Sequence, residues 1–265
     1  MNCEHNSKVR PTSVGDDPRP SKDPPVGLFR IVLADWVVLD IEGTLTATSQ
    51  VHVVLYDYAR PRLGPWIDAH GDDPVVADAV EQVRKLGDLP PSAGTDEVVA
   101  VLHGWMAADQ KIAPLKTLQG LIWERGYASG DLTTRLFPDV APKLRAWHAA
   151  GRRLAVFSSG SVAGQVASFS RTTDGDLTSL FSGHFDTVNA GPKREEPSYR
   201  AIAAALSADP ARIVFFSDVP AELDAARAAG WQTVGVAREG EPFGDADFGP
   251  HPTIGSFDEV DEVSA

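Results

Sequence analysis

Four short apolar runs, each followed by polar residues, stand out in the hydrophobic pattern of the chain. They are typical of buried strands, and they cover Trp36–Leu39, Arg153–Phe157, Arg212–Phe216 and Gln232–Val236. Helical periodicity surrounds the last three runs and predicts helices over 140–150, 161–169, 197–206 and 221–229. Strands that alternate with helices form a parallel sheet with helices on both faces. The sequence therefore predicts an α/β fold built on a doubly wound parallel sheet.

A different pattern follows the first strand. Between residues 45 and 135, apolar residues recur at helical spacing from Val51 onward, and no segment is typical of a buried strand. Pro61 and Pro65 are expected to close the first helix. Further helices are expected over 73–86, 95–111 and 115–123. The sequence thus predicts a helical cap, residues 49–133, inserted into an α/β core formed by residues 31–48 and 134–265.

The first 30 residues are polar and rich in proline, as in Pro18-Arg19-Pro20. Such a composition buries too little apolar surface to fold, so residues 1–30 are predicted to be a disordered extension. No apolar run approaches the roughly 18 residues of a membrane-spanning helix, and the N-terminus lacks an apolar signal core. The single cysteine, Cys3, excludes an intrachain disulfide. These features predict a cytoplasmic protein that does not enter a membrane.

The charge balance of the chain is acidic. Its 265 residues include 37 Asp and Glu against 24 Lys and Arg, which gives a formal net charge of −13. This balance argues against a general nucleic-acid-binding protein, although an anionic small molecule can still bind in a local positive pocket. No apolar surface stripe is evident in the sequence, so we expect a monomer.

Two acids follow the first predicted strand directly. Asp40 ends the apolar run, and Glu42 comes two residues later, before Gly43 and Thr44 turn the chain away. Residues at i and i+2 of an extended segment point the same way, so one acid can act as nucleophile or metal ligand while the other moves protons. A strand that simply ends in an acidic turn is the structural alternative.

Three further polar clusters follow strands or precede helices: Ser158 with Ser159, then Lys193, then Asp218 with Glu222. Each has a structural interpretation, since serines cap helices, lysines are usually solvated, and acids suit the first turn of a helix. The functional interpretation is that Ser158 and free N–H groups at the next helix start hold a phosphate. Helix capping does not require the whole set, which has acids after strands one and three, a hydroxyl after strand two and a lysine between strands two and three. Phosphoryl transfer through a carboxylate needs such a set, with oxygen ligands for Mg2+.

These residues lie in motifs that resemble those of the haloacid dehalogenase superfamily of phosphatases. The motifs are Asp40-Ile-Glu-Gly-Thr44, Phe157-Ser-Ser-Gly-Ser-Val162, Lys193 and Phe216-Ser-Asp-Val219. Glu42 stands where most of that superfamily has a second Asp. With Leu118-Gln-Gly-Leu-Ile-Trp123 and Gly183-His-Phe-Asp-Thr187, this variant is similar to the acireductone synthases, the bifunctional enolase-phosphatases of methionine salvage. The resemblance runs from about Val37 to Phe257.

The resemblance implies a reaction and a role for each residue. The family enolises 2,3-diketo-5-methylthiopentyl 1-phosphate and then dephosphorylates it to the acireductone. Asp40 would be the nucleophile, and Glu42 would be the general acid and base. One Mg2+ per subunit would be held by Asp40, Asp218 and Glu42, the last through its backbone carbonyl. Ser158 and Ser159 would hold the phosphate or carbonyl oxygens, Lys193 would orient Asp40, and Glu222 would position Lys193 or a metal-bound water.

Some features and alternatives stay open at this point. Leu45 replaces the family's usual second Thr, and Lys193 follows an unusual proline, which leaves fine substrate preference undecided. Trp105, Lys116 and Trp123 are candidates for closing the cap over the substrate, although the tryptophans also suit a cap core. The base of the enolisation step is not assigned. The alternatives are a phosphatase for another sugar or keto phosphate, a non-catalytic phosphometabolite-binding protein, and a dehalogenase.

Overall fold

A six-stranded sheet forms the centre of the computed structural model, which describes residues 1, 29–31, 34–110 and 112–262. All strand pairs in this sheet are parallel, and their order is β4-β3-β2-β5-β6-β7. The strands are β2 (Trp36–Leu39), β3 (Arg153–Phe157), β4 (Phe181–Phe185), β5 (Ile213–Ser217), β6 (Gln232–Val236) and β7 (Thr253–Ile254). The sheet confirms the predicted α/β class.

Both faces of the sheet are covered because successive strand residues point to opposite sides. The covering helices are α6 (Val140–Ala149), α7 (Val162–Ser170), α8 (Glu196–Ala205) and α9 (Pro220–Ala228). On one face, Leu39 and Phe216 belong to a buried core with Trp147 of α6 and Phe169 of α7. The core on the other face joins strand residues to α8 and α9. This arrangement confirms that the sheet is doubly wound.

The chain order places a crevice at the carboxyl ends of β2 and β5. From β2 the chain moves to β3 and β4 on one side, and it then returns to β5 on the other side of β2. Leu39, the last residue of β2, pairs with Val156 and with Phe216. Ligands of open parallel sheets bind where the strand order reverses in this way. Asp40 and Asp218 therefore follow the two strands that flank this point.

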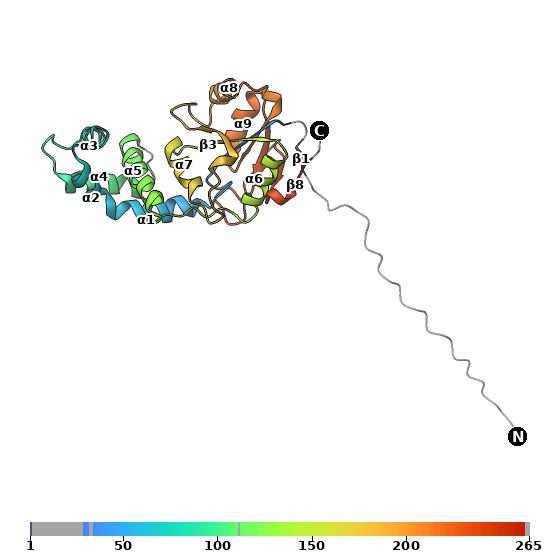
Figure 1. Cartoon of the computed structure of the whole chain (residues 1–265), viewed down its shortest axis with the longest axis horizontal. Coiled ribbons are helices and arrows are strands. Elements are labelled where there is room, and N and C mark those ends of the chain that lie inside the picture. Colours follow the sequence, from blue (N-terminus) through green and yellow to red (C-terminus); the bar gives the residue numbers. More distant parts are fainter. Residues whose placement is uncertain (2–28, 32–33, 111, 263–265) are drawn as a thin grey trace.

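Between β2 and α6 every named element of the described residues is a helix, and Figure 1 shows this part on one side of the sheet-containing part. The elements are η1 (Gln50–Leu55), α1 (Tyr56–Ala59), η2 (Arg60–Arg62), α2 (Leu63–His70), α3 (Pro74–Leu86), α4 (Thr95–Ala107) and α5 (Ala113–Ser129). They share a buried core that includes Leu63, Leu102 and Leu118. The insertion thus has its own hydrophobic core.

Several boundaries in this insertion differ from those predicted. Helix α5 extends from Ala113 to Ser129, beyond the predicted range of 115–123. Pro61 and Pro65 do not end the helical region, because Pro61 lies in a 3-10 turn and Pro65 in the first turn of α2. Proline is tolerated there because the first N–H groups of a helix have no intrahelical partner. Helix α4 ends at Ala107, before the predicted end, and Asp109 takes a left-handed backbone conformation with φ of 48°.

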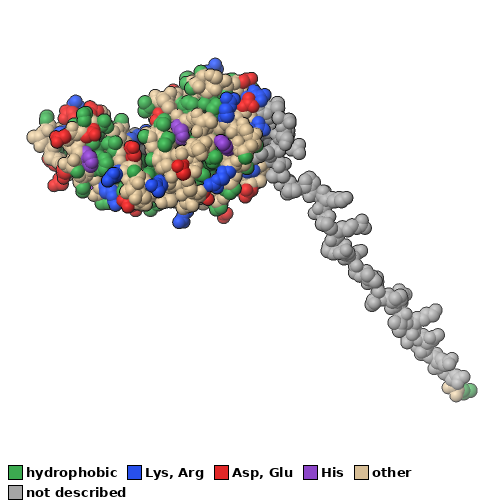
Figure 2. Space-filling view, in the orientation of Figure 1, with side chains coloured by type: hydrophobic (Ala, Val, Ile, Leu, Met, Phe, Trp, Pro, Cys, Tyr) green, Lys and Arg blue, Asp and Glu red, His purple; other side chains and the backbone are tan. Residues whose placement is uncertain are grey.

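A second, two-stranded parallel sheet joins β1 (Phe29–Ile31) to β8 (Val260–Glu262). Short 3-10 segments cover η3 (Thr178–Leu180), η4 (Pro210–Arg212) and η5 (Phe257–Glu259). The predicted disordered extension is wrong at its end, because Phe29 and Arg30 pair with β8 as part of β1. Residues 2–28 of the extension, including Cys3, lie outside the described residues. Within the described residues, no helix has the length and apolar character needed to cross a membrane. On the face shown in Figure 2, acidic and basic side chains are interspersed over both the helical insertion and the sheet-containing part.

Candidate active site

Asp40 and Lys193 form the centre of the site. Asp40 follows β2, its backbone N–H donates to the Phe216 carbonyl at 2.9 Å, and only 4% of the residue is exposed. Lys193 Nζ lies 2.6 Å from Asp40 Oδ1 and 2.6 Å from Glu222 Oε2. The Ile41 N–H also donates to Asp40 Oδ1, at 2.8 Å. These contacts fix the Asp40 carboxylate at the sheet edge, next to an ammonium group.

The loop before α8 is folded so that Lys193 reaches this position. The Tyr199 hydroxyl donates to the Lys193 carbonyl at 2.6 Å, and Ser198 Oγ donates to the Pro192 carbonyl at 2.7 Å. Gly191 has φ of 109°, and a Cβ there would lie 2.7 Å from Ser198 Oγ. The loop therefore needs a glycine, and the first turn of α8 anchors the lysine.

Asp40, Lys193, Asp218 and Glu222 form a buried charge cluster. Burial and nearby charges shift the pKa values of Lys193, Asp218 and Glu222. Burial acts to lower the pKa of Lys193, but the carboxylates of Asp40 and Glu222 outweigh it and raise that pKa. Burial, together with the negative charges of Asp40 and Glu222, raises the pKa of Asp218 to about 8. Burial raises the pKa of Glu222 to about 7, opposed by Lys193 and supported by Asp40. The cluster is thus short of positive charge and favours a cation.

Asp218 is placed by the turn after β2. Its backbone N–H donates to Thr44 Oγ1 at 3.0 Å, and its Oδ1 is buried without a hydrogen-bond partner among the described residues. A Cβ on Gly43 would overlap the Asp218 carboxylate, and Gly43 has φ of 74°. Gly43 and Thr44 of the sequence motif are therefore explained by the position of Asp218.

Replacing Gly43 with alanine is expected to lower both stability and activity. The left-handed backbone costs about 1–2 kcal/mol with a Cβ, and the overlap displaces Asp218 in addition. Gly240→Ala is the matched control, because Gly240 has φ of 81° and an added Cβ would meet open space among the described residues. Denaturant unfolding and initial-rate assays compare the two variants. Equal losses of stability with unchanged activity would contradict the placement of Asp218 by Gly43.

Glu42 lies between the core and the helical insertion. Its side chain is 25% exposed, and its Oε1 is 2.9 Å from His52 Nε2 in η1. His52 Nδ1 in turn lies 3.7 Å from Asp109 Oδ1, which accepts a hydrogen bond from Tyr56 at 3.1 Å. Glu42 is thus connected to the helical insertion while it lines the cavity described below.

Ser158 and Ser159 form the turn from β3 to α7. The Ser158 N–H donates to Phe185 O at 3.1 Å, and its Oγ accepts from the Gly160 N–H at 3.3 Å. The start of α7 is less free than expected. Val162 N–H donates to Asp186 Oδ2 at 3.0 Å, and Gly164 N–H donates to the N-cap residue Ser161 at 3.2 Å. The capping interpretation therefore holds for Ser161, while Ser158 and Ser159 face the cavity.

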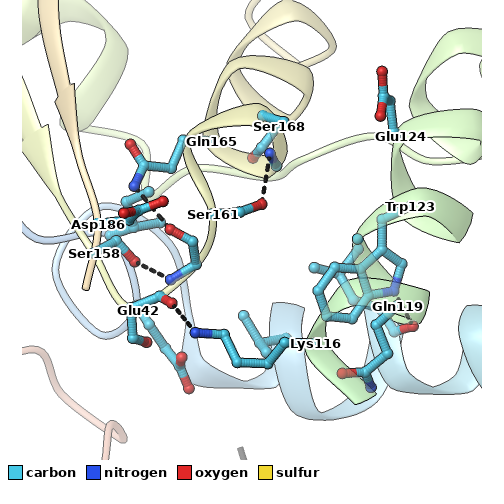
Figure 3. Close-up of a pocket in the computed structure, with 18 of the residues that line it drawn as sticks. Glu42, Lys116, Gln119, Trp123, Glu124, Ser158, Ser161, Gln165, Ser168 and Asp186 are labelled. Atoms are coloured by element: carbon cyan, nitrogen blue, oxygen red, sulfur yellow. Dashed lines mark hydrogen bonds between the residues drawn. The ribbon is translucent and has the colours of Figure 1, made fainter. Parts of the chain in front are cut away.

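A cavity of about 440 Å³ lies between the core and the helical insertion. In Figure 3, the core supplies Glu42, Ser158 and Asp186 on one side, and α5 supplies residues such as Lys116 and Trp123 on the other. Lys116 Nζ donates to the Ser159 carbonyl at 2.9 Å and so bridges the two sides. The lining includes Glu42 but not Asp40, Lys193 or Asp218, which lie at the sheet edge beside it.

The structure therefore brings Asp40, Glu222 and Lys193 into direct contact and places Asp218 within their electrostatic influence. Lys116 and Trp123 line the cavity, and both Trp105 and Trp123 pack against the core of the insertion. No spacing in the sequence indicates the contact of His52 with Glu42. The sequence does contain the Leu118-to-Trp123 motif, part of which lies on the cavity wall.

Comparisons with known proteins identify the family of the chain. The family model of the haloacid dehalogenase-like hydrolases matches residues 34–230. The chain belongs to this family of hydrolases.

Curated relatives narrow the assignment. The chain is 71% identical to "Enolase-phosphatase E1" of Saccharopolyspora erythraea over 231 residues, which cover 87% of this chain and 96% of the relative. It is 56% identical to the protein of the same name from Frankia alni, with 86% and 95% covered. Within the hydrolases, the chain belongs to the enolase-phosphatase E1 family.

Solved structures share the fold. The UTR4 protein of Saccharomyces cerevisiae aligns with a TM-score of 0.70 at 27% identity, covering 86% of this chain and 100% of that one. CbbY from Rhodobacter sphaeroides, in complex with xylulose-(1,5)bisphosphate, aligns with a TM-score of 0.55 at 20% identity over 87% and 97% of the chains. At that identity the second similarity concerns the fold alone.

Proposed function

We propose that this protein is a Mg2+-dependent enolase-phosphatase of methionine salvage. It converts 2,3-diketo-5-methylthiopentyl 1-phosphate to the acireductone, 1,2-dihydroxy-3-keto-5-methylthiopentene, and phosphate. The observation that carries the proposal is the Lys193–Asp40 contact of 2.6 Å at the edge of the sheet, next to the cavity between the core and the helical insertion. The enolase-phosphatase relatives support the choice of substrate.

The residues present fit a Mg2+ ion. In the part of the chain that the structure describes, no three or more His, Cys, Asp or Glu side chains are grouped as a complete metal site. Mg2+ requires less, because it keeps several waters and is held by one or two carboxylates plus substrate phosphate. The unpartnered Asp218 Oδ1 and the shortage of positive charge suit it. Asp40, Asp218 and the Glu42 backbone carbonyl would hold the ion, which neutralises phosphate charge and polarises a substrate carbonyl when bound.

The side chains of this chain perform the phosphoryl transfer. The Asp40 carboxylate attacks phosphorus and forms an aspartyl phosphate as the bond to the substrate oxygen breaks. Glu42 gives its proton to that oxygen and then takes a proton from the water that attacks the phosphoryl group. Water attack releases phosphate and restores the Asp40 carboxylate.

Neighbouring residues position these groups. Lys193 orients Asp40 and offsets phosphoryl charge, and Glu222 holds Lys193 while accepting a hydrogen bond from Ser217 at 3.0 Å. Ser158 and Ser159 bind phosphate or carbonyl oxygens. Residues 49–133 act as the cap that excludes water. The enzyme acts as a cytoplasmic monomer and binds one Mg2+ per subunit.

Replacing Asp218 with asparagine is expected to raise the unfolding temperature without Mg2+ and to remove stabilisation by Mg2+. The raised pKa of about 8 means that ionising Asp218 destabilises the folded state. This cost is absent below the unfolded-state pKa near 3.9, grows as the pH rises from there to about 8, and is complete above that pH. The variant should therefore gain roughly 2–8 °C at pH 9 and less at pH 5.

Thermal unfolding with and without Mg2+ checks this expectation. Asp72→Asn, in an exposed part of the insertion, serves as the control and should behave as the native protein does. If Mg2+ raises the unfolding temperature of Asp218→Asn as much as that of the native protein, Asp218 is not a ligand of the metal.

The substrate is tested by comparing kcat/KM for the diketo phosphate with values for sugar phosphates and a chromogenic phosphate. We expect a preference for the diketo phosphate of roughly a hundredfold or more, because buried polar groups left unpaired penalise the wrong ligand. Equal rates on all phosphates would leave a general phosphatase. No hydrolysis of any of them would overturn the enzymatic proposal.

A further inference from the structure

Helix α5 presents one face to the cavity. Residues at i, i+3, i+4, i+7 and i+11 share a face of a helix, and this face carries Lys116, Gln119, Gly120, Trp123 and Tyr127. All five line the cavity. A Cβ on Gly120 would lie 3.9 Å from Ser161 Oγ, so the face approaches the turn after β3 closely. The face is therefore in contact with the part of the core that carries Ser158 and Ser159.

Most polar groups on this face are already bonded within the protein. Lys116 donates to Ser159 O at 2.9 Å, and Trp123 Nε1 donates to Leu55 O at 2.8 Å. The Tyr127 hydroxyl shares a hydrogen bond of 2.8 Å with Thr134 Oγ1. These bonds join the helix to the rest of the insertion and to the core, and they leave these groups with structural roles.

Gln119 differs from these neighbours. The residue is only 2% exposed, and its Nε2 is buried without a hydrogen-bond partner among the described residues. A buried amide without partners destabilises a fold, typically by more than the bond itself is worth. Its presence on the cavity wall therefore indicates that a ligand supplies the partner.

We propose that the Gln119 amide is the cap residue that recognises the carbonyl groups of the substrate. An amide rotated about its terminal bond offers either N–H or C=O to a ligand. A diketone supplies only acceptors, which the N–H group satisfies, and an enol supplies a donor, which the C=O group satisfies. The choice of a carbonyl-bearing ligand rests on the proposed function.

The position of Gln119 suits this role. Lys116 and Gly120, on either side of it on the helix face, both approach the turn formed by residues 159–161. In Figure 3, Gln119 lies on the α5 wall, across the cavity from Glu42 and Ser158. The carbonyls of the proposed substrate adjoin its phosphate end, so they lie between the core and this wall.

Gln119→Met tests the inference, because methionine has nearly the same shape and offers no N–H donor. The ligands are a diketo phosphonate of the substrate's length, which is not hydrolysed, and the alkyl phosphonate of equal length without carbonyls. Calorimetric titration of the Mg2+-loaded full chain gives Kd for both. Gln82→Met is the matched control, since Gln82 on α3 already donates to Asp78 Oδ2 at 2.6 Å.

We expect Gln119→Met to weaken binding of the diketo phosphonate by roughly tenfold and to leave the alkyl phosphonate unchanged. We also expect the ligand-free variant to unfold at an equal or higher temperature, because an unsatisfied buried amide has been removed. Gln119→Glu provides a second variant of equal length and should likewise lose the preference for the diketo ligand. Gln82→Met should keep both affinities.

Three results would overturn the inference: unchanged diketo affinity in Gln119→Met, equal weakening of both phosphonates, or a native protein that does not distinguish the two ligands. A lower unfolding temperature together with equal weakening would instead assign Gln119 a structural role. The proposed function is tested separately by turnover of the native enzyme. If the native protein prefers the diketo phosphonate but does not dephosphorylate the diketo phosphate, the proposed function is wrong and the inference about Gln119 still holds.

Discussion

Replacing Asp40 with asparagine is expected to abolish phosphate release, with a loss of at least about a thousandfold in kcat. The amide has the shape of the carboxylate but is a poor nucleophile, and the reaction proposed here starts with attack by Asp40. The Phe216 carbonyl still accepts the backbone N–H at 2.9 Å, so the end of β2 is retained. We therefore expect a folded and inactive protein. Initial rates with a chromogenic phosphate and circular dichroism measure the two properties.

Asp35 provides the matched control for this substitution. It precedes β2 at the opposite end of the strand, where it pairs with Arg212 on the surface. Exposed ion pairs contribute about 1 kcal/mol or less, so Asp35→Asn should keep both fold and activity. Substantial phosphatase activity in Asp40→Asn would show that another group attacks phosphorus.

Replacing Lys193 with methionine is expected to lower both activity and stability. The ammonium lies 2.6 Å from each of two buried carboxylates, and breaking a buried ion pair leaves uncompensated charge that costs roughly 3–5 kcal/mol. Loss of a donor that offsets developing charge lowers kcat by roughly a hundredfold or more. This substitution should therefore be the most destabilising of those considered.

The pH dependence gives this expectation a specific sign. The folded-state pKa of Lys193 is raised, so its stabilising contribution is fully present below the unfolded-state pKa near 10.4 and stays constant from about pH 5 to 9. In the variant, the raised pKa values of Glu222 and Asp218 rise further because the nearby positive charge is lost. Their ionisation then opposes folding increasingly as the pH rises. The difference in unfolding temperature between variant and native protein should be smallest near pH 5 and largest near pH 9.

Thermal unfolding across this pH range, without added metal, measures the effect. Lys85→Met is the control, because Lys85 is 70% exposed and pairs with Glu81 on the surface of α3 at 3.5 Å. It should change the unfolding temperature little at any pH. A Lys193→Met curve parallel to the native curve would contradict the buried charge cluster.

The parallel sheet was predictable because its central strands are continuous apolar runs. The bounds of β2, β3 and β6 agree with those runs, since strands buried on both faces are apolar at nearly every position. Helix α2 was not predicted because proline usually ends a helix, although Pro65 occupies a position where no N–H bond is lost. The pairing of β1 with β8 joins distant ends of the chain, and no local pattern indicates such a contact.

The positions of the candidate site residues were more predictable than their contacts. Parallel strands bring Asp40 and Asp218 to one edge by topology alone, which the sequence order reveals. Lys193 comes from a loop, and its two carboxylate partners follow from three-dimensional packing. The same holds for the contact between His52 and Glu42, which depends on how η1 leaves the core. The unpartnered amide nitrogen of Gln119 is a property of packing, so only the structure reveals it.

The measurement that tests the central claim most directly follows enol absorbance and phosphate release together in one sample. The native enzyme is mixed with 2,3-diketo-5-methylthiopentyl 1-phosphate, with and without Mg2+. We expect an enol signal and stoichiometric phosphate, both dependent on Mg2+. Phosphate release without an enol signal would contradict the bifunctional reaction and leave a phosphatase. The absence of both phosphate release and an enol signal would contradict the proposed enzymatic function altogether.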